Sequence, residues 1–142
     1  MIYLFIGQPG VGKTEMAKML VEKLGEKTVW IDGDDLREIF PNKDYSYYGR
    51  LKNIEKSFTI ARFMSEKGYN VVISMVCPYR AAREDLKANN KVIEVLFNRA
   101  HFSGRNDYHV KEFEHPVSDH QVFVNGDNRE EDFEKLLGIL NL

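Results

Sequence analysis

An unbroken phosphate-binding pattern near the start of the chain constrains the fold more than any other feature. Residues 7–14 read Gly-Gln-Pro-Gly-Val-Gly-Lys-Thr, which matches G-x-x-x-x-G-K-[ST] without a gap. An apolar run, Ile2–Ile6, precedes the pattern, and the segment Lys13–Leu24 that follows has apolar residues at helical spacing. Between such a strand and helix, glycines let backbone N–H groups wrap phosphates, and the helix N-terminus adds positive potential. The sequence therefore predicts a nucleotide-phosphate site here.

Two side chains of this loop have predicted chemical roles. We expect the Lys13 ammonium to act in catalysis by reaching the β- and γ-phosphates of ATP. We expect the Thr14 hydroxyl to bind Mg²⁺, the cofactor that accompanies ATP. The residues predicted to bind the ATP phosphates are Gly7, Gly10, Val11, Gly12, Lys13 and Thr14.

Strand-like and helix-like segments alternate along the 142 residues. Further strands are expected at 28–31, 71–76, 92–97 and 121–124, and further helices at about 51–68, 78–88 and 133–140. This alternation predicts an α/β fold, the three-layer α/β/α sandwich of P-loop kinases with a five-stranded parallel sheet, in a single domain over 1–142. Residues 41–50 and 99–119 show little periodicity, and we expect the second stretch to be a lid.

An acidic stretch, 32–37, follows the second expected strand. Ligands of doubly wound sheets bind beyond the carboxyl ends of the strands, so we predict that Asp34 is a catalytic carboxylate and a second magnesium-binding residue. The alternative is a turn in which one aspartate, Asp32, Asp34 or Asp35, caps the next helix, and both interpretations can hold together.

The third expected strand ends in Ser74–Arg80 without an acidic residue, which favours a kinase over a motor-type ATPase. Arg80 and Arg83 follow on the same rim of the expected sheet. We predict that Arg80 binds the substrate, because a guanidinium grips anionic oxygens in pairs. The alternative for both arginines is a solvated helix face.

Composition narrows the class of partner. The chain has 20 Lys and Arg against 22 Asp and Glu, a formal net charge of −2, which disfavours a nucleic-acid partner. No apolar run approaches the roughly 20 residues needed to span a bilayer, so we expect a cytoplasmic protein without a membrane partner. The single cysteine, Cys77, suits a reducing compartment and is expected to be buried rather than reactive. A homodimer is compatible with the sequence.

Three more stretches share the spacing of one kinase family. Residues 32–37 read D-G-D-D-L-R, residues 45–54 read Y-S-Y-Y-G-R-L-K-N-I, and residues 77–80 read C-P-Y-R. A weaker similarity is F-E-H-P at 113–116. With the phosphate loop, these stretches give the chain a resemblance to adenylyl-sulfate kinase, whose motifs are Asp-Gly-Asp-x-x-Arg, Phe-Ser-x-x-Asp-Arg-x-x-Asn-Ile, Ser-Pro-Tyr-Arg and Tyr-Glu-x-Pro.

The resemblance implies an enzyme that moves the γ-phosphate of ATP to the 3′-hydroxyl of adenosine 5′-phosphosulfate, a small anionic nucleotide. Asp34 would be its catalytic carboxylate. Arg37, Arg50 and Asn53 would hold the nucleotide, and Tyr45 would stack on its base; packing of the loop is the alternative for Tyr45. In the lid, the resemblance suggests Arg105 near ATP and Tyr108 near the substrate.

The chain departs from this family at three places. Gly49 stands where the family has Asp, Glu55-Lys56 replaces an Arg-Arg pair, and the lid is short. These differences leave open a kinase of another small nucleotide or metabolite. A polynucleotide or modified-base kinase and a nucleotide-binding regulatory module without turnover are further alternatives. The charge balance disfavours the first of these, and the intact Lys13, Thr14 and Asp34 disfavour the second.

Overall fold

The computed structural model describes residues 1–99 and 110–142. All strand pairings are parallel, and the five-stranded sheet has the order β2-β3-β1-β4-β5. The α/β sandwich predicted from the alternation of strands and helices is therefore confirmed. The elements are β1 (Ile2–Ile6), α1 (Lys13–Leu24), β2 (Thr28–Asp32), α2 (Gly33–Ile39), α3 (Tyr47–Glu66), β3 (Asn70–Ser74), α4 (Arg80–Asn89), β4 (Val92–Arg99), β5 (Gln121–Asn125) and α5 (Arg129–Leu140).

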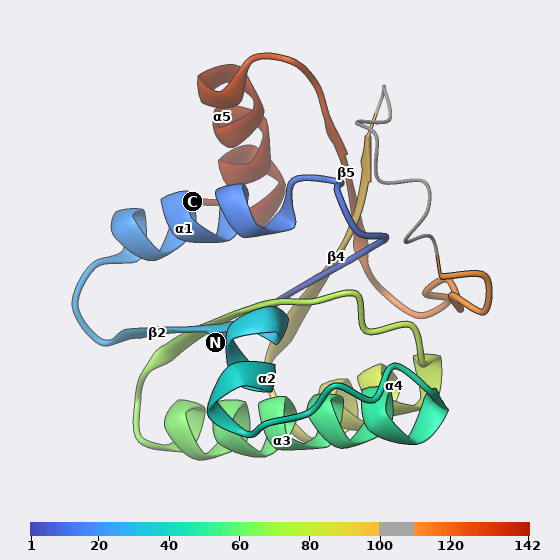
Figure 1. The fold of residues 1–142 in the computed structure, drawn as a ribbon. Helices are drawn as coiled ribbons and strands as arrows, with labels where there is room; N and C mark the ends of the chain where they lie inside the picture. Colours follow the sequence, from blue (N-terminus) through green and yellow to red (C-terminus); the bar gives the residue numbers. More distant parts are fainter. Residues whose placement is uncertain (100–109) are drawn as a thin grey trace.

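The central strand β1 is buried along its whole length because helices cover both faces of the sheet. On one face Tyr3 and Phe5 pack against apolar residues of α1 and α5. On the other face Ile2, Leu4 and Ile6 pack against α2, α3 and α4. Figure 1 shows these two helical layers, with α1 and α5 on one side of the sheet and α2, α3 and α4 on the other.

The topology brings the functional motifs to one edge of the sheet. The phosphate loop follows β1, which lies between β3 and β4. The acidic stretch follows β2, and Asp32 at the end of β2 lies opposite Ser74 at the end of β3. Because the strands are parallel, their carboxyl ends meet at the same edge, which is where such folds bind ligands.

Several elements differ from the sequence expectations in their presence or their bounds. Residues 33–39 form a short helix, α2, and α3 begins at Tyr47 rather than near residue 51. Strand β3 ends at Ser74, and Cys77 has φ 48°, so the chain turns before α4 begins at Arg80. In the described ranges, the structure contains no helix with the length and apolar composition required to cross a membrane.

Candidate active site

The Lys13 ammonium lies inside the phosphate loop. Its Nζ donates to the backbone carbonyls of Gly7 and Gln8, each at 2.8 Å. Lys13 is 8% exposed, so burial and these bonds hold its charge within the loop. The loop wraps around the position where this cation can meet a phosphate.

Two side chains from the ends of neighbouring strands support the same loop. Arg99, the last residue of β4, donates from Nη1 to the Gly10 carbonyl at 3.2 Å. Asn125, the last residue of β5, donates from Nδ2 to the Val11 carbonyl at 3.0 Å. Neither residue was predicted from the sequence, although their position at the carboxyl ends of strands could have suggested them.

Asn125 also explains one glycine of the motif. Gly12 has φ 90°, a left-handed conformation that side chains disfavour. A Cβ at this position would overlap with the Asn125 side-chain nitrogen. Gly12 is therefore favoured by its backbone conformation and by the Asn125 side chain, which would have to give up its hydrogen bond to Val11 to make room for a Cβ.

A line of hydrogen bonds fixes a carboxylate beside the phosphate loop. Thr14 donates from Oγ1 to Asp32 Oδ1 at 3.2 Å, and Ser74 donates from Oγ to the same oxygen at 2.8 Å. Trp30 in turn donates from Nε1 to Ser74 Oγ at 2.9 Å. Asp32 precedes α2, but its side chain makes no capping hydrogen bond. For Asp32, the capping alternative is therefore wrong.

The oxygens of Thr14 and Asp32 suit the cofactor expected from the sequence. Mg²⁺ binds oxygen ligands and usually takes only one or two from protein side chains, with phosphates and water supplying the rest. Asp34, the other predicted magnesium ligand, is exposed in the first turn of α2. Its assignment to metal binding and catalysis remains a prediction.

Asn53 and Arg37 lie near α2 but bind the protein's own backbone. Asn53 is 5% exposed and donates from Nδ2 to the Gly33 carbonyl at 3.2 Å, which joins α3 to the start of α2. Arg37 Nη1 donates to the carbonyls of Asn42 and Asp44, each at 3.0 Å. Both residues thus shape the chain around the predicted site, and their contact with a substrate remains a prediction.

Tyr45 packs on Arg37, whose guanidinium carbon lies 4.1 Å from the ring centroid. This geometry matches the loop-packing alternative for Tyr45. One face of a ring stacked on a cation remains able to stack on a base, so the two roles are compatible.

A cavity of about 330 Å³ opens beside Tyr45. The rings of Tyr47 and Tyr79 lie 4.8 Å apart, and burial raises the pKa of the Tyr79 hydroxyl, although nearby Arg50 opposes this effect. Arg50 lies 3.9 Å from Glu112, which is largely exposed. The cavity therefore combines aromatic rings with a guanidinium. Its lining residues are Tyr45, Ser46, Tyr47, Arg50, Tyr79 and Glu112.

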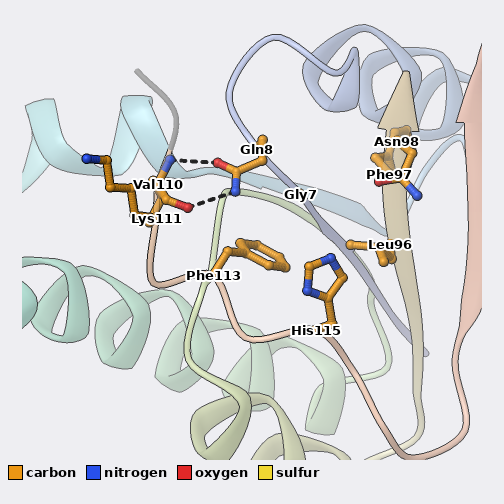
Figure 2. A pocket seen from close by; sticks show the side chains of 9 residues that line it. All are labelled: Gly7, Gln8, Leu96, Phe97, Asn98, Val110, Lys111, Phe113 and His115. Atoms are coloured by element: carbon orange, nitrogen blue, oxygen red, sulfur yellow. Dashed lines mark hydrogen bonds between the residues drawn. The ribbon is translucent and has the colours of Figure 1, made fainter. Parts of the chain in front are cut away.

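A second cavity, of about 230 Å³, lies directly against the phosphate loop. Figure 2 shows it between the loop, the end of β4 and the segment 110–115. Gln8 faces Val110 across one side, and Phe113 and His115 lie on the opposite part of the wall. The lining residues are Gly7, Gln8, Leu96, Phe97, Asn98, Val110, Lys111, Phe113 and His115.

Arg80 and Arg83 bind residues 114 and 115, which lie within the predicted lid. Arg80 donates from its backbone N to Glu114 Oε1 at 2.8 Å and from Nε to the His115 carbonyl at 2.7 Å. Arg83 is fully buried and pairs through Nε with Glu94 Oε2 at 2.7 Å. A solvated helix face is therefore wrong for Arg83. The acidic residue within the apolar strand 92–97 was the signal that a buried cation had to lie nearby.

Cys77 lies in the described part of the chain, whereas two predicted lid residues do not. Cys77 is buried, and burial raises the pKa of its thiol to about 12, which agrees with the expectation of a buried rather than reactive side chain. Arg105 and Tyr108 lie outside the described residues, as does most of the predicted lid before Val110.

Comparison with known proteins leads to the same family that the motifs resemble. A family model described as Adenylylsulphate kinase matches residues 1–111. The adenylyl-sulfate kinase of Vibrio cholerae is 33% identical over 101 residues, which cover 66% of this chain and 47% of that protein. The probable adenylyl-sulfate kinase of Archaeoglobus fulgidus is 35% identical over 94 residues, covering 63% of this chain and 61% of that protein. The matched region is thus less than two thirds of the length of either relative.

Solved structures agree in fold. The Mycobacterium tuberculosis APS kinase CysC in complex with AMPPNP and APS superposes with a TM-score of 0.79 at 19% identity, covering 99% of this chain and 97% of that chain. An unliganded sugar kinase from Janibacter superposes with a TM-score of 0.74 at 14% identity, covering 99% and 94%. Because kinases of different acceptors match almost equally well, these superpositions establish the fold alone.

Proposed function

Because the chain belongs to the adenylylsulphate kinase family, we propose that it transfers the γ-phosphate of ATP to the 3′-hydroxyl of adenosine 5′-phosphosulfate. The product would be 3′-phosphoadenosine 5′-phosphosulfate. The observation that carries the proposal is the 3.2 Å hydrogen bond between Thr14 and Asp32 at the edge of a complete phosphate loop. It places a hydroxyl and a carboxylate together where a kinase needs oxygens beside the terminal phosphates.

On the ATP side, the backbone N–H groups of residues 10–13 would cradle the phosphates. The Lys13 ammonium would exchange its bonds to the loop carbonyls for bonds to the β- and γ-phosphate oxygens. Thr14 would bind Mg²⁺ directly, with Asp32 and Asp34 orienting its water ligands. When bound, the ion supplies charge neutralisation across the β- and γ-phosphates.

On the acceptor side, Asp34 would accept the proton of the attacking 3′-hydroxyl. The hydroxyl oxygen forms the new bond to the γ-phosphorus while the bond to the bridging oxygen of ADP breaks. Lys13 and the N–H groups of the loop would stabilise the charge that develops on the γ-phosphoryl oxygens.

The 330 Å³ cavity provides features suited to the acceptor. Tyr45, Tyr47 and Tyr79 supply aromatic faces for a purine, and Arg50 supplies paired donors for an anionic group. Arg37 would hold Tyr45 in place through its stacking contact. Arg80 would affect acceptor binding indirectly, because it holds Glu114 and His115 in place. Asn53 would do so by fixing the start of α2.

A kinase of another small nucleotide or metabolite is the second candidate. Two observations favour it: Arg37 Nη1 is engaged by carbonyls of its own loop, and Gly49 lacks the carboxylate of the family pattern. Both differences lie around the acceptor cavity rather than the phosphate loop. They leave the phosphoryl-transfer machinery unchanged.

The test is a coupled assay of ADP release with ATP and Mg²⁺. Adenosine 5′-phosphosulfate is compared with other nucleotides, sugars and oligonucleotides. Arg50→Ala should weaken use of the true acceptor about tenfold or more while leaving ATP affinity nearly unchanged. Arg62→Ala, an exposed arginine on the same helix, is the matched control. Turnover of another small nucleotide alone would establish the second candidate, and no turnover with any acceptor would favour the regulatory module.

We place this reaction in the cytoplasm, where a protein with a single thiol suits the reducing conditions. ATP and the acceptor are its proposed partners, without a nucleic acid or a membrane. Whether the chain forms a homodimer is measured directly by light scattering of the purified protein.

A further inference from the structure

One side chain of the phosphate loop binds the backbone of a residue far along the chain. Gln8 donates from Nε2 to the Val110 carbonyl at 2.9 Å and accepts from the Val110 N–H through Oε1 at 2.8 Å. Figure 2 shows this reciprocal pair beside the 230 Å³ cavity. Val110 is 5% exposed, so both of its backbone polar groups need partners within the protein. A primary amide can satisfy a donor and an acceptor together.

The segment that begins at Val110 separates the two cavities of the site. Val110, Lys111, Phe113 and His115 line the cavity against the phosphate loop. Glu112, which lies between them in sequence, lines the tyrosine-rich cavity beside Arg50. A displacement of this segment would therefore change the width of both cavities at once.

The C-terminal end of the segment 110–115 is held by several hydrogen bonds to the start of α4 and the residues just before it. The Glu114 N–H donates to the Pro78 carbonyl at 2.9 Å, and Arg80 donates to Glu114 and His115. At its N-terminal end, the Gln8 amide provides both hydrogen bonds at Val110. Residues 110–112 also make a long pair between Arg50 and exposed Glu112, which is worth little.

We propose that Gln8 is a positioning residue that fixes the segment 110–115 against the phosphate loop and thereby sets the width of the two cavities that this segment lines. The inference rests on the proposed kinase function for its effect on turnover. The Gln8 backbone carbonyl accepts from Lys13, and this contact does not require the amide side chain. Loss of the amide therefore weakens acceptor binding while the ATP-binding backbone keeps its shape.

The experiment uses the full chain with Gln8→Met, which keeps the length of the side chain without its amide, and Gln8→Ala. Gln121→Ala, at an exposed position that begins β5, is the matched control. Hydrogen exchange of the Val110 amide should accelerate about tenfold or more in both Gln8 variants and remain unchanged in the control. Affinity for a fluorescent ATP analogue should stay within about twofold, while the KM for adenosine 5′-phosphosulfate rises about tenfold.

Failure of the inference and failure of the proposed function give different results. Unchanged exchange at Val110 would overturn the positioning role, as would an equal loss of affinity for the ATP analogue and the acceptor. If the wild-type chain does not use adenosine 5′-phosphosulfate, the proposed acceptor is wrong. The exchange and ATP-analogue measurements then still decide whether Gln8 holds the segment independently of the phosphate site.

Discussion

Asp34 and Asp35 form a matched pair for testing the catalytic carboxylate. Both side chains are exposed, and both lie in the first turn of α2. Both carboxylates therefore interact favourably with the positive end of the helix, by about 0.3–1 kcal/mol each. The variants Asp34→Asn and Asp35→Asn keep side-chain size and remove one charge from the same turn.

The expected magnitudes separate stability from catalysis. Each variant should lose at most about 1 kcal/mol of unfolding free energy, which lowers the melting temperature by roughly 2–4 °C at this size. Turnover should fall about 100-fold or more in Asp34→Asn alone, a rise of about 2.7 kcal/mol in the barrier. ATP affinity should change little, because the loop backbone and Lys13 supply most of its contacts.

The assay follows single-turnover formation of ADP, with thermal unfolding of the same samples as the stability readout. Turnover of Asp34→Asn within about fivefold of wild type would refute the assignment. Equal losses in both variants would also refute it, because they would indicate a general effect of charge at α2. A normal Asp34→Asn with an inactive Asp32→Asn would move the catalytic role to the carboxylate that binds Thr14.

Three further outcomes follow from the site and its support. Lys13→Ala should abolish phosphoryl transfer without unfolding the chain, and activity within about twofold of wild type would contradict the phosphate-loop assignment. Arg83→Met should cost about 3–5 kcal/mol in urea unfolding, because Glu94 keeps only Lys87 as a cationic partner and the Cys77 and Glu114 carbonyls lose a donor. Glu84→Gln at a less buried position should cost far less, and equal costs in the two variants would contradict this expectation. The Cys77 thiol, with its pKa raised to about 12 by burial, should resist Ellman's reagent at about pH 8 until urea unfolds the chain, and rapid reaction of the folded protein would contradict that burial.

The parts of the fold that could be predicted are those where two signals in the sequence agree. The phosphate-loop pattern and the flanking periodicity together located β1 and α1 with their observed bounds. Helix α2 has only 7 residues, too few for apolar periodicity to reveal it. The start of α3 was placed too late because its first turn carries exposed tyrosines rather than an apolar stripe.

The site was predictable in its residues more than in its contacts. The motif singles out Lys13 and Thr14, whose roles stay predictions, but nothing in the sequence indicated the hydrogen bond from Thr14 to Asp32. Asn125 and Arg99 support the loop from strands far away in sequence; their place at strand ends could have made them candidates, but the contacts themselves leave no local pattern. For the same reason, the burial of Arg83 could not be read from the polar helix that carries it.

Gly49 marks the place where the chain departs from the family pattern, and the structure gives a physical reason for the glycine. It lies buried in the first turn of α3, where helix propensity alone favours alanine by up to about 1 kcal/mol. A Cβ here would overlap with the backbone oxygen and side chain of Asp44. Asp44 is itself fixed, because its Oδ1 accepts from the Ser46 N–H at 2.9 Å. The loop therefore cannot withdraw from an added methyl group without losing the turn that begins the helix.

Gly49→Ala should consequently destabilise the chain by about 1–3 kcal/mol, the reverse of the sign expected from helix propensity. Gly138→Ala is the matched control, because Gly138 lies within α5 and a Cβ there would meet nothing within 4 Å. That variant should gain about 0.5–1 kcal/mol. Urea unfolding of both variants measures the difference, and a Gly49→Ala protein as stable as wild type would show that the Asp44 loop yields freely.

The predicted loss would mean that the family's aspartate cannot be restored at this position alone, since Asp44 already brings a carboxylate to the same space. The hydrogen bonds from Ser46 lower the pKa of Asp44, so this carboxylate stays ionised next to Tyr45 and Ser46, which line the 330 Å³ cavity.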